Sequence, residues 1–179
     1  INPKIPYNVM TDLTPIINVA ATPNILAVHP SFPGKDYKSF LEEVKRSPGR
    51  YSYSSSGTGG IGHLQTELFK SLAGVFITHI PYRGAVPSIT DLMGGQVQLS
   101  CQAVPSLPTF EKTGRLRSLG VTTLTRTIIA PNVPPIAETI PGFEILGWYG
   151  MLAPLRTPKE LIRKINGAVL QALKTAEVQ

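Results

Sequence analysis

A run of small and hydroxyl-bearing residues is the part of this sequence best suited to bind a ligand. Residues 53–64 read YSSSGTGGIGHL, between an expected strand and an expected helix. Small residues let the backbone approach a ligand closely, and the start of a helix offers unpaired N–H groups and the positive end of its dipole. Such a turn suits a carboxylate or a phosphate. A turn that only joins two elements is the plain alternative. The residues expected to bind the anion are Ser55, Ser56, Gly57, Thr58 and Gly59.

Two further segments are expected at the same edge of a sheet. Residues 81–88, PYRGAVPS, again follow a strand and precede a helix. Tyr82 could supply a phenol there, and Gly84 and Ala85 could expose backbone amides. Gln102 follows the expected strand 96–101. Turns that follow the ends of parallel strands fall along one edge, where ligands bind, so these four residues join the predicted site. An ordinary turn with a half-buried tyrosine is the alternative.

The glycine loop also matches the spacing G-x-G-x-x-G, through Gly57, Gly59 and Gly62. A dinucleotide site would need an acidic residue at the end of the next strand. Residues 79–83, HIPYR, contain none, although Arg83 could meet a 2′-phosphate. No Gly-Lys-Ser/Thr follows, which excludes a P-loop, and Ser54 precedes Ser55 where a nucleophile elbow needs glycine. An α/β enzyme that uses a nucleotide or dinucleotide at residues 57–62 is therefore the weaker alternative.

Residues that could carry out catalysis are sparse. The expected loops contain amides and hydroxyls, with no paired carboxylates and no Ser/His/Asp set, so we expect binding without chemistry. His63 could be a base, but its place at a helix start suits a capping or loop hydrogen bond. His29 and His79 have no ligand-spaced partner, so no metal site is expected. The single cysteine, Cys101, fits a small core residue. No catalytic residue, metal or cofactor is predicted.

The order of expected elements predicts an α/β fold. Strands are expected at 16–20, 25–28, 51–54, 75–80, 96–101 and 116–121, with helices between several of them near 61–73, 86–93 and 105–112. This alternation indicates a layered fold with a largely parallel sheet. Residues 1–15 are expected to be irregular, and residues 127–147 to form a loop.

Three helices have specific expected features. Asp36 should cap a helix whose apolar face is Tyr37, Phe40, Leu41 and Val44. The helix after the glycine loop should place Ile61, Leu64, Leu68 and Leu72 on one face. In the last helix, Thr157 and Glu160 should form a capping box around Pro158, and this helix should still continue at Gln179. Its expected apolar face consists of Leu161, Ile165, Ala168, Val169 and Ala172.

Composition narrows the class of protein. The 179 residues are 42% hydrophobic and carry a net charge of +6, so the chain can bury a real core. The basic residues are scattered, without aromatic interleaving, which disfavours nucleic-acid binding. No run approaches the roughly 20 apolar residues of a membrane helix. The first residues, INPKIPYNVM, lack the features of a signal peptide. This does not indicate a cytosolic protein, because a mature secreted chain has lost its signal peptide.

The order of several motifs resembles one known family. The motifs are IPYNVMTDLTPI, ATPNILAVHPS, YSYSSSGTGGIGHLQTELFKSLAG, THIPYRGAVPSITDLMGGQVQ, GRLRSLGVTT, NVPPIAET and WYGMLAP followed by TPKELIRKIN. Together they resemble the solute receptors of tripartite tricarboxylate transporters (TctC), also called the Bug family. The sequence departs from the family at Gly60, where serine or threonine is common, and at Gln102-Ala103, where an acidic or amide pair is frequent.

The resemblance implies a type II periplasmic-binding-protein fold that closes like a flytrap. It implies that residues 23–145 form one lobe, and that residues 1–22 and 146–179 are parts of the other, whose N-terminal and C-terminal parts are absent. In the family, two loops and bound water hold a ligand carboxylate. Residues 55–59 match one of these loops, and residues 82–85 match another wall of the cleft.

The resemblance also implies location and partners. We expect a periplasmic receptor that captures a dicarboxylate, an amino acid or an aromatic acid for uptake or sensing. Membrane transporter subunits or a sensor kinase are the expected partners, and nucleic acid is not. Sequence does not separate transport from sensing. A dimer formed through the exposed sheet edges of a truncated lobe is also an open alternative.

Overall fold

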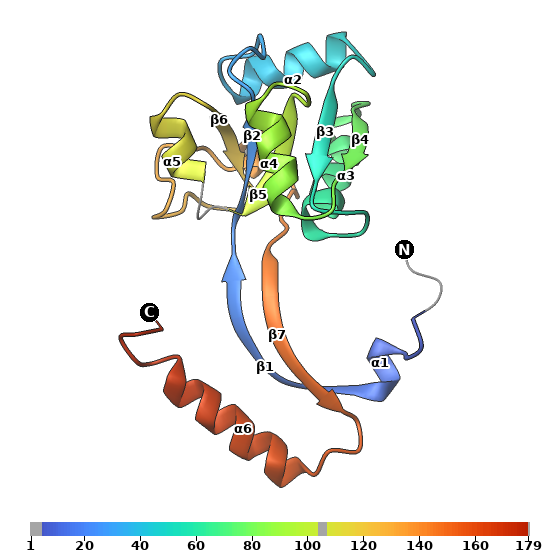
Figure 1. Cartoon of the computed structure of the whole chain (residues 1–179), viewed down its shortest axis with the longest axis vertical. Helices are drawn as coiled ribbons and strands as arrows, with labels where there is room; N and C mark the ends of the chain where they lie inside the picture. Colours follow the sequence, from blue (N-terminus) through green and yellow to red (C-terminus); the bar gives the residue numbers. More distant parts are fainter. Residues whose placement is uncertain (1–4, 104–106, 179) are drawn as a thin grey trace. The chain divides into compact units, whose positions relative to one another are not determined.

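The computed structural model describes residues 5–103 and 107–178, and the chain divides into two compact units. Residues Ile1–Ala21 and Trp148–Gln179 belong to unit 1, and residues Thr22–Gly147 to unit 2. Figure 1 shows the order of the elements along the chain. In the part of the chain that the structure describes, no helix is long and apolar enough to cross a membrane.

Unit 2 is an α/β layer built on a five-stranded sheet. The strands lie in the order β4-β3-β5-β2-β6. Strand β3 pairs in parallel with β4 and β5, whereas β2 is antiparallel to β5 and β6. Four strands therefore run one way and β2 runs against them, so the expected largely parallel sheet contains one reversed strand. The strands are β2 (Asn24–Val28), β3 (Ser52–Ser55), β4 (Thr78–Pro81), β5 (Leu99–Ala103) and β6 (Arg117–Val121).

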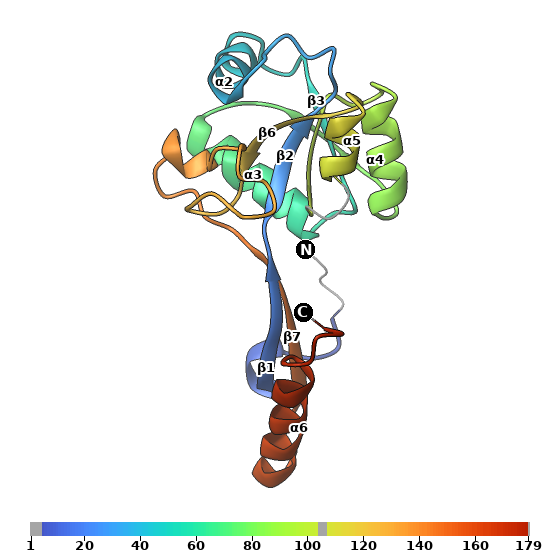
Figure 2. The same ribbon diagram turned by 90° about the vertical axis from the view of Figure 1, so that its left-hand side faces the viewer.

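Helices cover both faces of this sheet. In Figure 2, α2 and α3 lie on one side, and α4 and α5 on the other. Every residue of β2 is buried, because its alternate side chains enter a separate core on each face. Leu26 and Val28 join the core under α2 and α3, while Ile25 and Ala27 join the core under α4 and α5. The helices are α2 (Tyr37–Arg46), α3 (Ile61–Ala73), α4 (Ala85–Met93), α5 (Leu107–Lys112) and the short 3₁₀ helix η2 (Ile136–Glu138).

Helix α2 confirms the sequence prediction. Asp36 accepts a hydrogen bond from the Ser39 amide at 2.8 Å, and the Ser39 hydroxyl completes a capping box. The hydrogen bond from the Ser39 amide, and after it the one from the Ser39 hydroxyl, lowers the pKa of Asp36. The predicted inward residues Tyr37, Phe40 and Val44 are buried in the core.

Helix α3 turns a different face inward from the predicted one. Its buried residues are Gly62, Gln65, Thr66 and Phe69. Of the predicted face, Leu68 packs against the core and is partly buried, whereas Ile61, Leu64 and Leu72 are exposed. The physical reason is close packing on β5, since a Cβ at Gly62 would lie 2.5 Å from the Cys101 carbonyl oxygen. At this point of closest approach the helix has room for glycine only.

Unit 1 contains α1 (Val9–Asp12), strands β1 (Leu13–Thr22) and β7 (Gly147–Pro154), and α6 (Lys159–Ala172). Residues 9–15 are thus helix and strand, where irregular chain was predicted. The two strands pair with one another, and Asn166 of α6 donates a hydrogen bond to the Ile16 carbonyl at 2.8 Å. Unit 1 is thus one strand pair with a helix tethered to it.

Two predictions for the last helix are wrong, and the third is right in part. Pro158 is the N-cap and no side chain caps the helix, so the Thr157–Glu160 box does not form. The helix ends at Ala172, before a series of turns. Of the predicted apolar face, Ile165 and Val169 are half-buried, whereas Leu161, Ala168 and Ala172 are exposed. Gln179 and the start of the helix expected at 105–112 lie outside the described residues.

Candidate functional site

The loop from Ser56 to Gly60 connects β3 to α3 and depends on two glycines. Gly57 has a φ of 144° and Gly59 a φ of 83°, and side chains rarely adopt either value. The Gly60 amide donates to the Gly57 carbonyl at 3.2 Å, which closes the turn. The loop therefore needs glycine for its shape, independent of any ligand.

The start of α3 offers backbone donors to the loop. Gly60 is the N-cap and no side chain caps the helix, so the N–H groups of Ile61 and Gly62 lie at an end without a side-chain acceptor. The Gly59 amide is already used, because it donates to His63 Nδ1 at 3.1 Å. His63 therefore holds the loop, as the capping alternative predicted, and its accepting nitrogen is unprotonated in this arrangement.

The structure brings the two predicted loops together. The Tyr82 amide donates to the Ser55 carbonyl at 2.9 Å, and the Gly84 amide donates to the Ser56 carbonyl at 3.2 Å. Gly84 has a φ of 115° and is the N-cap of α4. Ala85, the first residue of α4, is exposed. Both loops thus form one backbone surface at the ends of β3 and β4.

The predicted hydroxyls are not equivalent. Ser55 is buried, and its Oγ lies 2.7 Å from His79 Nε2 and donates to the Gly57 carbonyl at 3.1 Å. Ser56 and Thr58 are exposed. Ser55 is therefore a support for the loop, and Ser56 and Thr58 are the hydroxyls that solvent or a ligand can reach.

An aromatic stack under the loop was not predicted. The ring of His79 stacks on Tyr53 at 4.7 Å on one side and on His63 at 4.2 Å on the other. Tyr53 donates to Glu67 at 2.5 Å, and Lys70 donates to the same carboxylate at 2.6 Å. The alternation of Tyr53 and Ser55 along β3 was a signal that both side chains share one face.

The surroundings of the stack shift the pKa values of its members. Burial lowers the pKa of His79, and the neighbouring His63 lowers it further. Burial and the hydrogen bond to Glu67 raise the pKa of Tyr53. Burial alone would raise the pKa of Glu67, but the hydrogen bonds from Lys70 and Tyr53 hold it below its ordinary value. The stack is therefore built around a neutral His79 and an ionised Glu67.

Tyr82 and Gln102 have partners inside unit 2. The Tyr82 hydroxyl donates to Asp91 at 2.7 Å, which raises the pKa of the phenol. The hydroxyl proton of Tyr82 is therefore not available to a ligand, and its ring could only line a wall of the site. Gln102 is buried and donates to the hydroxyls of Ser88 and Ser100.

Other candidate chemistry is absent from the described residues. Across residues 5–103 and 107–178, no group of three or more His, Cys, Asp or Glu could hold a metal ion. Cys101 is buried under α3, and burial raises the pKa of its thiol to about 12. An inert core cysteine agrees with the sequence analysis.

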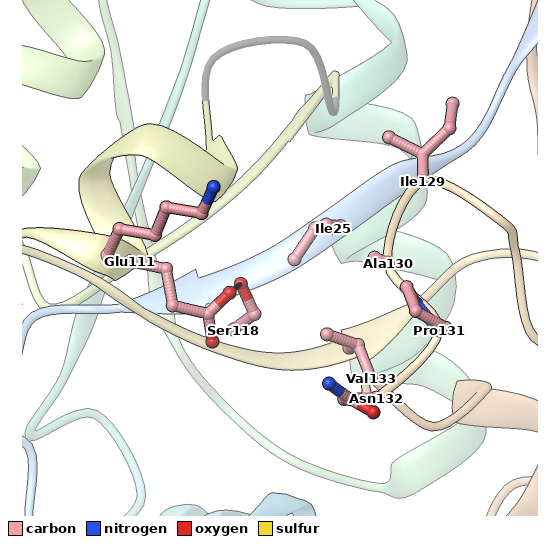
Figure 3. A pocket seen from close by; sticks show the side chains of 9 residues that line it. Ile25, Glu111, Ser118, Ile129, Ala130, Pro131, Asn132 and Val133 are labelled. Carbon is pink, nitrogen blue, oxygen red and sulfur yellow. Dashed lines mark hydrogen bonds between the residues drawn. The ribbon is translucent and has the colours of Figure 1, made fainter.

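A surface pocket lies away from both loops, between β6, α5 and residues 129–133 (Figure 3). Its volume is about 330 Å³. Glu111 accepts a hydrogen bond from Ser118 at its rim, and Ile25 and Val133 form part of its floor. Lys112 and Asn132 supply donors to this pocket, but the Glu111 carboxylate beside them disfavours an anion, so the loops remain the better candidate.

Comparison with known proteins identifies the family. The model of the tripartite tricarboxylate transporter family receptor matches residues 1–179. The chain belongs to this family. A curated relative, the UPF0065 protein in the tcbD-tcbE intergenic region of Pseudomonas sp. (strain P51), is 35% identical over 178 residues, which are 98% of this chain and 53% of that protein. The chain thus spans about half the length of the curated relatives that it matches.

Solved structures of the receptor family have the same fold. Rpa4515 of R. palustris with adipate has a TM-score of 0.87 and 35% identity, over 98% of this chain and 59% of that one. MatC (Rpa3494) from Rhodopseudomonas palustris with bound malate has a TM-score of 0.87 and 28% identity, over 98% and 60%. The predicted periplasmic-binding-protein fold is confirmed, and part of that fold is present here.

Proposed function

We propose that the protein is a solute-binding receptor that holds a small carboxylate and does no chemistry on it. The observation that carries this proposal is the backbone surface formed by two joined loops at the N-termini of α3 and α4, where Ser56 and Thr58 present exposed hydroxyls. Such a surface stabilises an anion without activating it. The family, and the adipate and malate bound by two of its solved members, support the same ligand class.

The proposal gives each of the nine predicted residues a role. Ser56 and Thr58 would contact the carboxylate, and Ser55 would support their loop. Tyr82 would line a wall of the site, and Gln102 would face the ligand from β5. The backbone around the carboxylate would be shaped by Gly57, Gly59, Gly84 and Ala85. Unit 2 would be one lobe and unit 1 part of the other. Lobe closure around the ligand would bury it.

Location and partners follow from the proposed role. A receptor of a tripartite transporter captures its solute before the solute reaches the membrane, so we place the protein in the periplasm, with membrane transporter subunits as partners. A sensor kinase is the alternative partner, and co-purification from solubilised membranes would distinguish the two. A dimer through the exposed sheet edges of the truncated lobe stays an untested alternative.

A thermal-shift screen of the intact protein tests the function. Dicarboxylates, amino acids and aromatic acids are compared with dinucleotides and nucleoside phosphates. A ligand at about 100 times its dissociation constant should add roughly 2.7 kcal/mol to the free energy of unfolding. We expect a shift with one carboxylate class. A shift from dinucleotides alone would replace the receptor with the alternative enzyme.

Paired variants locate the ligand. Thr58→Val and Ser56→Ala remove exposed hydroxyls from the loop, and Thr125→Val and Ser71→Ala remove exposed hydroxyls elsewhere. Each loop variant should weaken carboxylate binding about 3- to 10-fold, because it removes at most one hydrogen bond to a charged group. The control variants should bind as the wild type does. Equal affinities in all four would place the ligand away from this loop.

A further inference from the structure

Four buried polar side chains form a closed network under α4. They are Ser54 of β3, Ser88 of α4, and Ser100 and Gln102 of β5, none more than 6% exposed. Gln102 Nε2 lies 2.9 Å from Ser88 Oγ and 2.8 Å from Ser100 Oγ. The network links the end of β5 to the first turns of α4, the helix that begins at the second predicted loop.

The serine protons fix the orientation of the Gln102 amide. Ser100 Oγ donates to the Ser54 carbonyl at 3.0 Å, and Ser88 Oγ donates to Ser54 Oγ at 2.8 Å. Ser54 Oγ in turn donates to the Ser88 carbonyl at 3.4 Å. Each hydroxyl has one proton, so the oxygens of Ser88 and Ser100 can only accept from Gln102. With these donations the NH₂ group faces the two serine oxygens, since an amide oxygen in that place would meet two acceptors.

The amide oxygen of Gln102 is consequently an acceptor to which none of the described residues, 5–103 and 107–178, donates. Gln102 Oε1 is not among the enclosed side-chain atoms without a partner in that part of the chain, which are Asn24 Oδ1 and Tyr37 OH. Gln102 is the penultimate residue of β5, at the end of the sheet where the parallel strand β3 also finishes.

We propose that Gln102 Oε1 determines ligand specificity by selecting carboxylates that carry a hydrogen-bond donor, a hydroxyl or an ammonium group. The proposal rests on the receptor function above. A donor on the ligand would satisfy the oxygen, whereas a plain dicarboxylate would leave it unpaired or place a second acceptor against it. A site built to hydrogen-bond a ligand group discriminates against the analogue that lacks it.

Matched ligands of equal length test this specificity. Calorimetric titration of the intact protein compares succinate with L-malate and L-aspartate, and adipate with 2-hydroxyadipate and 2-aminoadipate. In the length class that binds, we expect the donor-bearing ligand to bind at least about tenfold more tightly. Equal affinity for the plain dicarboxylate would overturn the specificity proposal and leave the receptor function standing. Absence of binding by every carboxylate would overturn both.

A Gln102→Met variant assigns the discrimination to this residue. Methionine keeps the length of the side chain and removes both the amide oxygen and its anchor. The preference for the donor-bearing ligand should fall to about twofold or less, and this ratio is the readout, whatever the change in the absolute affinity for the two ligands. A preference that persists in a folded variant would overturn the proposal, with circular dichroism to establish folding. If the variant does not fold, the wild-type comparison of matched ligands still decides.

Discussion

At the scale of the residue, the contact between Ser55 and His79 connects the loop to a titrating group. His79 lies between Tyr53 and His63, with Glu67 and Lys70 as the charged neighbours. Burial holds its pKa below the ordinary value of 6.5. Between the lowered pKa and 6.5 the unfolded chain binds more protons than the folded one, so the free energy of unfolding falls as pH drops through this window.

The pH dependence of His79 is measurable. Urea midpoints of the wild type should decrease more between pH 7.5 and pH 5 than those of a His79→Gln variant, which keeps a hydrogen-bonding partner for Ser55 without a titrating ring. His29, whose imidazole is hydrogen-bonded to the hydroxyl and amide of Ser31, provides the matched control as His29→Gln. The same decrease in wild type and His79→Gln would contradict the role given to His79.

Residue types and spacing were sufficient to predict which loops meet, but not which of their side chains are free. The two glycine-rich turns follow neighbouring parallel strands, so their contact follows from the alternation of elements. The bond from Ser55 to His79 and that from Tyr82 to Asp91 depend on side-chain rotamers across strands. Periodicity along the sequence contains no information on such pairs.

At the scale of the element, α3 rests on β5 by its small residues. Gly62→Ala would place a Cβ against the Cys101 carbonyl. We expect this variant to lose about 1–3 kcal/mol of stability, as for an overpacked core site. Ser71→Ala, at an exposed position of the same helix, should change stability by less than about 0.5 kcal/mol. Chemical denaturation compares the two, and a neutral Gly62→Ala would contradict the close packing.

Helix α3 also shows why its inward face was mispredicted. A count of leucines favoured Ile61, Leu64, Leu68 and Leu72, because large apolar residues usually point inward. The decisive contacts are instead those of Gln65, which accepts from Asn24 Nδ2 at 2.5 Å and donates to the Ile145 carbonyl at 3.1 Å. Buried polar pairs distant in sequence override an apolar period that is visible locally.

Helix α2 contributes Phe40 to the core that also contains Phe69 of α3. This side chain is fully buried against Phe32, Tyr37 and Phe69. Phe40→Ala should cost about 3–5 kcal/mol. Phe76 is 60% exposed, so Phe76→Ala should cost far less. Thermal melts would show the difference, and similar losses in both variants would contradict the assigned core.

At the scale of the whole molecule, unit 2 contains nearly all the buried hydrophobic residues. Among the described residues of unit 1, Ala153 is the buried one. A Cβ at Gly147 would lie 3.2 Å from Thr22 Oγ1, so the chain enters and leaves unit 2 at adjacent points. We expect residues 22–147 to fold alone with one cooperative transition by circular dichroism. An unfolded fragment would show that its core depends on other parts of the chain.

Amide chemical shifts of the intact, isotopically labelled protein, with and without the carboxylate that stabilises it, test the receptor proposal most directly. The account predicts the largest changes at residues 56–62 and 84–85, which include the first N–H groups of α3 and α4 and the exposed hydroxyls of Ser56 and Thr58. Changes confined to the pocket lined by Ile25, Ser118 and residues 129–133 would contradict it.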